Sequence, residues 1–268
     1  MIGKLSAMLR LAGVAVLGAA AVASVAMPAH AADFSARDIA SRLHAASSGG
    51  GPVDLAGRNL SDLDLAGLDM KSVKLAGADL FGADLSRADL SGVDLTHARL
   101  DRAVLIGSNF ARANLMGATV LRPSTSEGLE ARADEAVDFS GANLSGARLF
   151  GRFEGANFRG ANLKGASLAP FGRTGFIEHI WRTDLRSADL TGANLAGADL
   201  EQVMLAFAKL NGADLSGAKF KNADLSGADF TGANVAGADF GGAALEGAKL
   251  SGALGLAAAI GLGQSEGR

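Results

Sequence analysis

The stretch that decides the fold is residues 75–100, LAGADLFGADLSRADLSGVDLTHARL. Leucine returns at every fifth position, with a small residue two places before it and a polar residue between them. Residues two apart point the same way in an extended chain, so the small residue and the leucine face inward. The next two residues must turn the chain, and glycine suits this corner because it tolerates positive φ. The pattern predicts a coil whose short edges stack in parallel about 4.8 Å apart.

The five-residue period extends through most of the chain. It covers 14 units over residues 55–120, seven units over 139–168 with a one-residue slip after Leu149, and 14 units over 185–250. All 35 central residues are Leu, Phe, Val or Met, and the position two places earlier is Ala in 24 of them. Aromatic residues make up only 5 % of the chain. This low content is typical of a narrow tube with room for one large side chain per edge.

The pattern resembles that of the pentapeptide-repeat family, A-(D/N)-L-x-x, over residues 55–120, 137–168 and 183–252. The resemblance implies an all-β fold, a right-handed quadrilateral parallel β-helix with four units per coil and nearly nine coils.

The segment before the repeats predicts a short helix. Residues 34–47, FSARDIASRLHAAS, contain Ser35 as an N-cap and apolar residues on one helical face. The first units depart from the repeat, because Arg58, Leu63 and Leu68 occupy the small-residue slot. We therefore expect the first coil to be distorted or packed against another element, and we expect the helix to cover it as a lid.

The chain is expected to fall into eight segments. In order, they are a signal peptide (1–31), an N-terminal helical cap and linker (32–52), repeats (53–120), an insertion loop (121–136), repeats (137–168), an aromatic insertion loop (169–182), repeats (183–252), and a C-terminal cap and tail (253–268). Within the last segment, the apolar run LGLAAAIGLG is expected to close the final coil.

Residues 1–31 have the features of a secretory signal peptide. Lys4 and Arg10 precede an uncharged apolar run over 11–27, and Ala29-His30-Ala31 forms a small-x-small cleavage site. A retained membrane anchor is the alternative, although this run is short for a membrane span. We predict cleavage after Ala31, a periplasmic or secreted protein, and no membrane span after cleavage.

The charge and cysteine content exclude several classes of protein. Removal of residues 1–31 takes away two of the 25 basic residues and no acidic one, leaving 23 basic and 28 acidic residues and a net charge of −5. This mild charge argues against a nucleic-acid-binding surface. The absence of Cys excludes a disulfide scaffold, a thiolate metal site and a Cys nucleophile.

Stacking at 20-residue intervals predicts outer columns of mixed sign. One column contains Asp54, Lys74, Asp94 and Asn114, and another contains Asp189, Lys209, Asp229 and Lys249. Mixed signs relieve like-charge repulsion between neighbouring coils, so these columns indicate a solvated wall rather than a ladder of calcium sites.

The two insertions are the departures from the repeat large enough to hold a site. Seven edges lie between them, so on a four-sided coil they should emerge at adjacent corners and pack together. The functional interpretation is a binding surface on a rigid scaffold, and the alternative is a tolerated insertion that covers the tube wall. The candidate partner-binding residues are Phe171, Arg173, Phe176, Glu178, His179, Trp181 and Arg182.

No motif in the sequence indicates catalysis. Zinc-binding His pairs, a nucleophile elbow, a phosphate-binding loop and a dinucleotide fingerprint are all absent, so we predict no catalytic residue, no cofactor, no metal and no enzyme. The predicted function is a non-enzymatic exported scaffold or protein-interaction module of the cell envelope. Its protein partner is unidentified, and the chain is a monomer or an end-to-end or side-by-side dimer.

The resemblance supplies an alternative function, because some members of the family mimic duplex DNA and bind type II topoisomerases. Two features of this chain disfavour that role. The predicted export would separate the protein from a cytosolic topoisomerase, and Lys or Arg residues interrupt the outward acidic columns.

Overall fold

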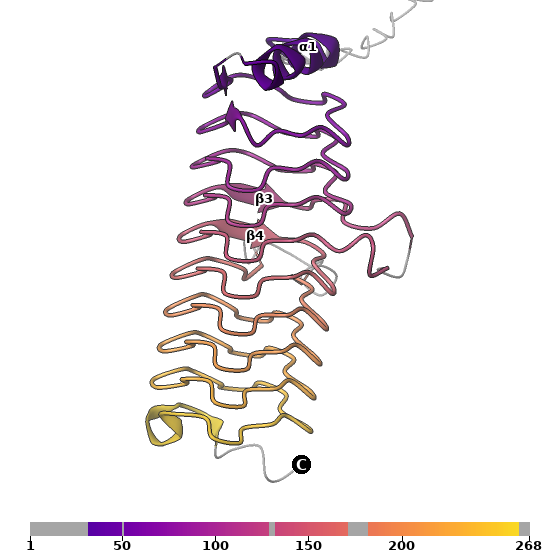
Figure 1. The fold of residues 1–268 in the computed structure, drawn as a ribbon. Coiled ribbons are helices and arrows are strands. Elements are labelled where there is room, and N and C mark those ends of the chain that lie inside the picture. The colour runs from indigo at the N-terminus through magenta and orange to yellow at the C-terminus, as the bar shows by residue number, and fades with distance from the viewer. Residues whose placement is uncertain (1–31, 50, 129–131, 171–181, 263–268) are drawn as a thin grey trace, which may run out of the picture. The chain divides into compact units, whose positions relative to one another are not determined.

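A computed structural model shows how the repeats are arranged. It describes residues 32–49, 51–128, 132–170 and 182–262. After the N-terminal helix, the chain winds into a stack of four-sided coils (Figure 1). Most edges pair through single parallel bridges between residues 20 apart, such as Asn59 with Asp79. The predicted parallel β-helix is therefore confirmed.

Few edges are long enough to count as strands. β1 (Val53–Asp54) pairs in parallel with β2 (Val73–Lys74), and β3 (Thr119–Leu121) pairs in parallel with β4 (Arg148–Phe150). The short edges follow from the corners, where a residue with positive φ interrupts the extended chain every five residues.

The coil has four sides, which we name in chain order by their first outward residue. Face A begins at Asp54, face B at Asn59, face C at Asp64 and face D at Asp69. The outward residues of face A are Asp54, Lys74, Asp94, Asn114, Asn143, Asn162, Asn194, Asp214, Asn234 and Leu254. Those of face C are Asp64, Asp84, Val104, Ser124, Arg152, Asp184, Met204, Asp224 and Ala244. Both columns expected from the sequence are present, one on face A and one on face D.

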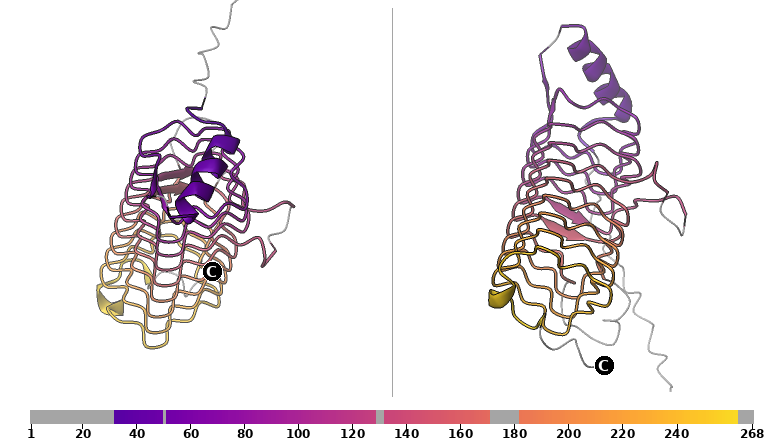
Figure 2. Two further views of the ribbon diagram at one scale, coloured as in Figure 1. Left: turned by 45° about the horizontal axis from the view of Figure 1, so that its top comes forward. Right: turned by 60° about the horizontal axis from the view of Figure 1, so that its bottom comes forward.

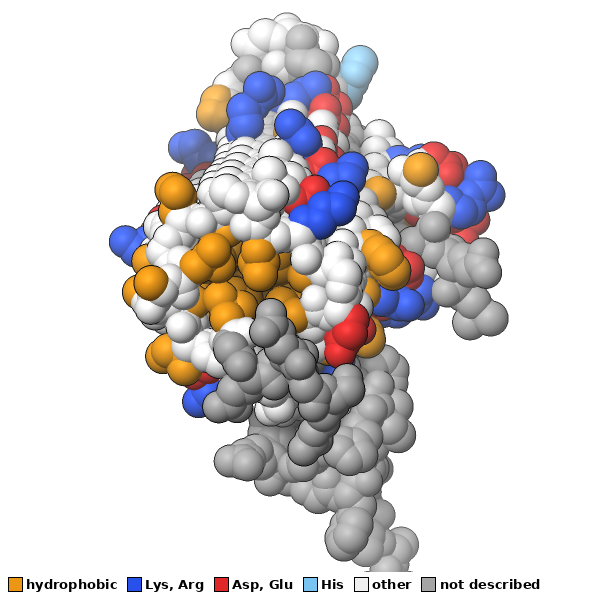
Figure 3. Space-filling model, turned by 90° about the horizontal axis from the view of Figure 1, so that it is seen from below, with side chains coloured by type: hydrophobic (Ala, Val, Ile, Leu, Met, Phe, Trp, Pro, Cys, Tyr) orange, Lys and Arg blue, Asp and Glu red, His pale blue; other side chains and the backbone are white. Residues whose placement is uncertain are grey.

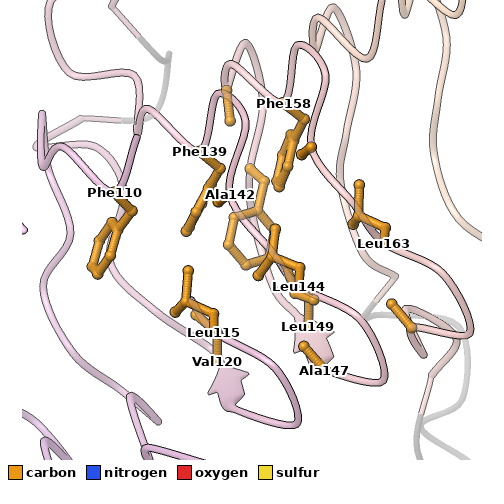
Figure 4. Close-up of a cluster of buried hydrophobic side chains, with 14 of the residues drawn as sticks. Phe110, Leu115, Val120, Phe139, Ala142, Leu144, Ala147, Leu149, Phe158 and Leu163 are labelled. Atoms are coloured by element: carbon orange, nitrogen blue, oxygen red, sulfur yellow. The ribbon is translucent and has the colours of Figure 1, made fainter. Parts of the chain in front are cut away.

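The core is a continuous column of the central residues and their Ala neighbours. On face D, the rings of Phe110, Phe139 and Phe158 lie one above another, with centroids 5.2 and 5.0 Å apart (Figure 4). The small slots of these coils hold buried Ala residues such as Ala142. The tube is filled because one large side chain alternates with one small one at each edge.

The predicted helix is α1 (Ala36–Ser47), which begins with a capping box. The Asp38 backbone N–H donates to Ser35 Oγ at 3.2 Å, and the Ser35 backbone N–H donates to Asp38 Oδ2 at 3.0 Å. A hydrogen bond from the Ser35 hydroxyl also lowers the pKa of Asp38. Ile39 is fully buried in the core, and Leu43 packs against it.

The helix lies across the first coil, as expected for a lid (Figure 2). Leu63 and Leu68, in slots that hold Ala elsewhere, pack against the core at this end. The backbone edge is also paired, because the Asp33 N–H donates to the Asn59 carbonyl oxygen and Asp33 Oδ2 accepts from the Asn59 N–H, both at 2.8 Å. The N-terminal end therefore presents a covered edge.

The C-terminal end differs from the predicted cap. Leu254 bridges to Asn234 and Ile260 to Asp239, with the short helix η1 (Leu256–Ala258) between them. These residues continue the ladder and so form the last edges themselves, with Leu254 62 % and Ile260 58 % exposed. Figure 3 shows hydrophobic side chains in the middle of this end.

Candidate functional site

The irregularities of the chain gather on face C and at its two corners. The insertion predicted at 121–136 begins later than expected, because one further edge of face C lies within it and Ser124 bridges to Val104. This edge escapes detection in the sequence because Pro123 replaces the small Ala and Thr125 replaces the central leucine.

The first excursion leaves face C after Thr125, at the corner between faces C and D. Its start is fixed by the Thr125 hydroxyl, which donates to the Arg152 carbonyl oxygen at 2.9 Å. Its end is fixed by Glu135, whose carbonyl oxygen accepts from the Gly107 N–H at 2.7 Å. The Glu135 side chain is buried, and its Oε2 accepts from the Glu127 N–H at 3.3 Å. The excursion is therefore tied to the coil at both ends.

The one-residue slip after Leu149 also lies at face C. Gly151 occupies the small-residue slot with φ 152°, which leaves Phe150 alone to turn the corner. A Cβ at Gly151 would lie 2.8 Å from Cδ of Pro123 in the preceding coil. The close approach of these two backbones requires glycine here, and the chain reaches the next centre, Phe153, one residue early.

The second excursion joins face B to face C, between Leu168 and Thr183. Thr183 is fully buried in a small-residue slot, and its hydroxyl donates to the Leu168 carbonyl oxygen at 2.6 Å. This bond joins the two points where the chain leaves and rejoins the coil. The two excursions thus flank face C from adjacent corners, as the edge count predicts.

An ion-pair cluster lies where the second excursion returns. Arg186 donates from Nε to Asp184 Oδ1 at 2.9 Å and from Nη2 to Asp184 Oδ2 at 2.7 Å. Its Nη2 also lies 3.5 Å from Oε2 of Glu154 in the preceding coil. The hydrogen bonds that Arg186 donates to the Asp184 carboxylate raise the pKa of Arg186 above its usual value. Asp184 is only 2 % exposed, and its bidentate pair with the half-exposed Arg186 holds the return point of the excursion in place.

The residues predicted as a partner-binding site fall mostly outside the described part of the chain. Phe171, Arg173, Phe176, Glu178, His179 and Trp181 are among the residues that are not described. Arg182 is described and is exposed beside the buried Thr183. The packing of the two excursions against each other stays a prediction.

Two apolar residues on the same side of the molecule were not singled out by the sequence. Met204 occupies an outward slot of face C, and Phe207 lies at the corner between faces C and D with 69 % of its surface exposed. The signal was available, because residues 205–210 read LAFAKL where the next residues, 210–215, read LNGADL. A phenylalanine in a slot otherwise held by glycine or polar residues marks this unit.

The described part of the chain has neither a metal-binding cluster nor a membrane-spanning helix. No group of three His, Cys, Asp or Glu residues within the described ranges is arranged to hold a metal ion. The described histidines are His44 on α1 and His97 at a corner, where its ring lies over Gly117. Among the described residues, no helix has the length and apolar character needed to cross a membrane.

The outer columns carry compensating charges. Lys74 lies 4.0 Å from Asp54 on face A, and on face D Lys249 lies 3.9 Å from Asp229. The pKa of Asp229 falls to about 2, chiefly because the Thr231 hydroxyl donates to its carboxylate. These exposed pairs form a solvated wall of alternating sign, which matches the expectation from the sequence.

A comparison with known families identifies the class of protein. The profile of pentapeptide repeats matches in eight copies, over residues 53–87, 83–119, 135–169, 183–222 and 223–253. These segments make up more than half of the chain, so the chain belongs to the pentapeptide-repeat family.

Several solved structures are similar to it. HetL, a pentapeptide repeat protein involved in heterocyst differentiation regulation in Nostoc sp. strain PCC 7120, is 28 % identical, with a TM-score of 0.39, over 85 % of this chain and 98 % of HetL. Trypsin-treated QnrB1, a plasmid-mediated fluoroquinolone resistance protein, is 21 % identical, with a TM-score of 0.39, over 74 % of this chain and 89 % of QnrB1. A pentapeptide repeat protein from the Arabidopsis thaliana thylakoid lumen is 30 % identical, with a TM-score of 0.23, over 47 % of this chain and 79 % of the Arabidopsis protein. No curated protein matches the chain.

Proposed function

We propose that this protein is a non-enzymatic exported scaffold of the cell envelope that presents face C and its two excursions to a protein partner. The observation that carries the proposal is the gathering of both excursions and the slip on one face of four. Each excursion is joined to the coil by hydrogen bonds at its base, including the one from Thr183 to Leu168. Such a support displays a loop without deforming the coil, which is how rigid folds usually carry binding residues.

Export is supported by the n-region, apolar run and cleavage pattern of residues 1–31. We expect the protein recovered from the periplasm or the medium to begin at Ala32. Cell fractionation followed by determination of the N-terminus measures this directly. A chain in the cytosol that begins at Met1 would contradict the export proposal and make a topoisomerase inhibition assay the next step.

The surface charge supports a scaffold over a mimic of duplex DNA. A mimic needs regular columns of negative charge, whereas the middle of face A holds Asn114, Asn143, Asn162 and Asn194 in succession. Faces A and D also contain lysines within their acidic columns. The array of phosphate-like charges is therefore interrupted on both faces.

The second excursion can be removed without changing the register of the repeats. Deletion of residues 171–182 joins Pro170 to Thr183, so that Leu168 and Leu185 become consecutive centres five residues apart. The last corner residue must adopt positive φ, which proline cannot, so the deletion is combined with Pro170→Gly. We expect the shortened chain to keep its β-rich circular dichroism spectrum and to lose its protein partners in pull-down experiments.

The matched control is Pro170→Gly in the full-length chain, which keeps the excursion. It is expected to retain every partner of the unmodified protein. If the shortened chain folds and captures the same partners as this control, the second excursion is not the binding element and the proposal falls.

A further inference from the structure

Phe207 combines two unfavourable features. Its φ of 61° lies in the left-handed region, and its side chain is 69 % exposed. Ten described residues other than glycine have positive φ, and the other nine are Asp, Arg, His, Ser, Gln or Asn. A bulky apolar residue is disfavoured both in this backbone conformation and in water. Neither feature is explained by the packing of the coil, since glycine occupies the same slot in most other units.

The ring of Phe207 is nevertheless held in place. It lies over Gly227 of the next coil, where an added Cβ would approach Cδ1 and Cε1 of the ring to 2.7 Å. The Phe207 N–H donates to the Ser226 carbonyl oxygen at 2.9 Å, which ties the corner to the same coil. One face of the ring is thus packed on backbone while much of the side chain faces water. A rigid aromatic group of this kind loses little conformational entropy when a partner covers it.

Met204 places a second apolar side chain in the same coil. It fills an outward slot of face C, between Asp184 in the preceding coil and Asp224 in the next. Before the last edges of the stack, the outward slot holds an apolar residue at Val104, Met204 and Ala244, all of them on face C. Face C is therefore the side on which outward slots accept apolar residues as well as polar ones.

The charges near this apolar pair are mainly negative. Glu201 lies at the other corner of the same face C edge, Asp224 follows Met204 on face C, and Glu246 lies at the corner three coils beyond Arg186. Three of the nearby basic residues are already engaged by acidic ones. Arg186 is held by Asp184, Lys209 lies 3.9 Å from Asp189, and Lys221 lies 3.3 Å from Asp239.

We propose that Phe207 and Met204 are the anchor of a docking surface for a second protein, whose complementary surface is an apolar pocket rimmed by Lys or Arg side chains. A second copy of this chain fits poorly, because a symmetric contact would bring the same carboxylates together. The inference rests on the proposed role as a protein-binding scaffold, but it places the contact on described residues outside the second excursion.

The test uses the full-length mature protein with a photo-crosslinking residue, benzoylphenylalanine, at Ser226 beside Phe207. The matched control site is Ser145, which lies beside Met116, another apolar corner residue with 41 % of its surface exposed. Crosslinking is performed in cells, and the product is identified by mass spectrometry. Each site is compared with and without an asparagine substitution, Phe207→Asn for Ser226 and Met116→Asn for Ser145.

We expect one heterologous protein to crosslink at Ser226, with a yield at least tenfold lower in Phe207→Asn. Asparagine tolerates positive φ, so this variant should unfold at the same or a higher temperature than the unmodified chain. Loss of crosslinking then cannot be attributed to unfolding. Met116→Asn should change nothing at Ser226.

The identified protein is then purified, and its affinity is measured by calorimetry. We expect Phe207→Asn to weaken binding at least tenfold. The triple variant Glu201→Gln, Asp224→Asn, Glu246→Gln should weaken binding and reduce its dependence on salt concentration. Crosslinking only to a second copy, a product unaffected by Phe207→Asn, or no product at Ser226 would each overturn the proposal.

Two variants separate this inference from the proposed role of the second excursion. Phe207→Asn leaves the excursion intact, and deletion of 171–182 with Pro170→Gly leaves Phe207 in place. Binding lost only in the deletion variant would uphold the proposed function and reject the Phe207 anchor. Binding lost only in Phe207→Asn would reject the excursion as the binding element and uphold the anchor.

Discussion

Faces A and C are built from the same repeat, yet the outward side chains of the two faces form their hydrogen bonds differently. On face A, the Asn143 side-chain amide donates to Asn114 Oδ1 at 2.9 Å, and the Asn162 amide donates to Asn143 Oδ1 at 3.0 Å. Each amide finds its partner in the preceding coil because the same residue type occurs there. Face C has Ser, Arg, Asp and Met in successive coils and no such run.

This difference shows that one face of a repeat can stabilise the stack while another presents varied side chains. A column of identical side chains uses its hydrogen-bonding groups on itself and offers a partner a uniform surface. A column of unlike side chains gives up that ladder, but each position presents distinct chemistry at a fixed height on the coil. Face A thus stabilises the stack, and under the proposed function face C is the side that a partner recognises.

The largest expected effect is at the slip on face C. Gly151→Ala would place a Cβ 2.8 Å from Pro123 Cδ and 3.3 Å from the Arg122 Cα, where neither neighbour is a flexible chain end. We expect the free energy of unfolding to fall by about 2–4 kcal/mol, as in other overpacked sites. Urea unfolding followed by circular dichroism measures it.

The matched control is Gly146→Ala at the corner between faces A and B. This glycine has φ 62° and open space around the position of a Cβ, so the substitution should cost about 1 kcal/mol through backbone strain alone. Equal losses for the two variants would show that the contact between Gly151 and Pro123 adds nothing to the strain.

A smaller effect is expected in the face A ladder. Asn143→Asp replaces the amide that donates to Asn114 Oδ1 with a carboxylate, and Asn114 cannot turn its own amide because that nitrogen donates to Thr96 Oγ1 at 2.7 Å. The lost bond and the facing oxygens should lower the free energy of unfolding by about 1–2 kcal/mol at neutral pH. Urea unfolding against the unmodified protein measures the difference.

The pH dependence of that difference has a definite sign. The facing oxygens raise the folded-state pKa of the new carboxyl, so the destabilisation is present above that pKa and disappears as the carboxyl is protonated at lower pH. The same change of charge on face C, Ser124→Asp, should stay within about 0.5 kcal/mol, since its side chain is exposed. If Ser124→Asp lowered the free energy of unfolding as much as Asn143→Asp, the contrast between faces A and C would be contradicted.

The sequence carries most of the fold because one periodic rule determines every edge. The apolar centres, the Ala slots and the 20-residue columns all follow from side-chain alternation and corner geometry. The rule fails where a residue is determined by a contact with another coil rather than by its place in the repeat. Thr125 substitutes a hydroxyl-to-carbonyl bond for a leucine centre, and Gly151 is needed only because Pro123 lies above it.

The candidate site was less accessible to sequence reasoning. The edge count correctly put the two excursions at adjacent corners, but the residues chosen on the second one lie mainly outside the described chain. Met204 and Phe207 belong to face C only after the unit at Thr125 is counted and the coils are aligned across both excursions. Their exposure depends on neighbours 20 residues away, which a local motif does not contain.

The unequal ends of the stack give the molecule a direction of growth. In repeat proteins each unit folds on its neighbour, so a finished coil is the template for the next. The end with α1 is synthesised before the edges at Leu254 and Ile260, and its own edge is already paired by Asp33. Synthesis therefore proceeds from the end covered by α1 toward the end where Leu254 and Ile260 are exposed. Another 20-residue coil appended at that end would lengthen the protein while every residue of face C kept its neighbours.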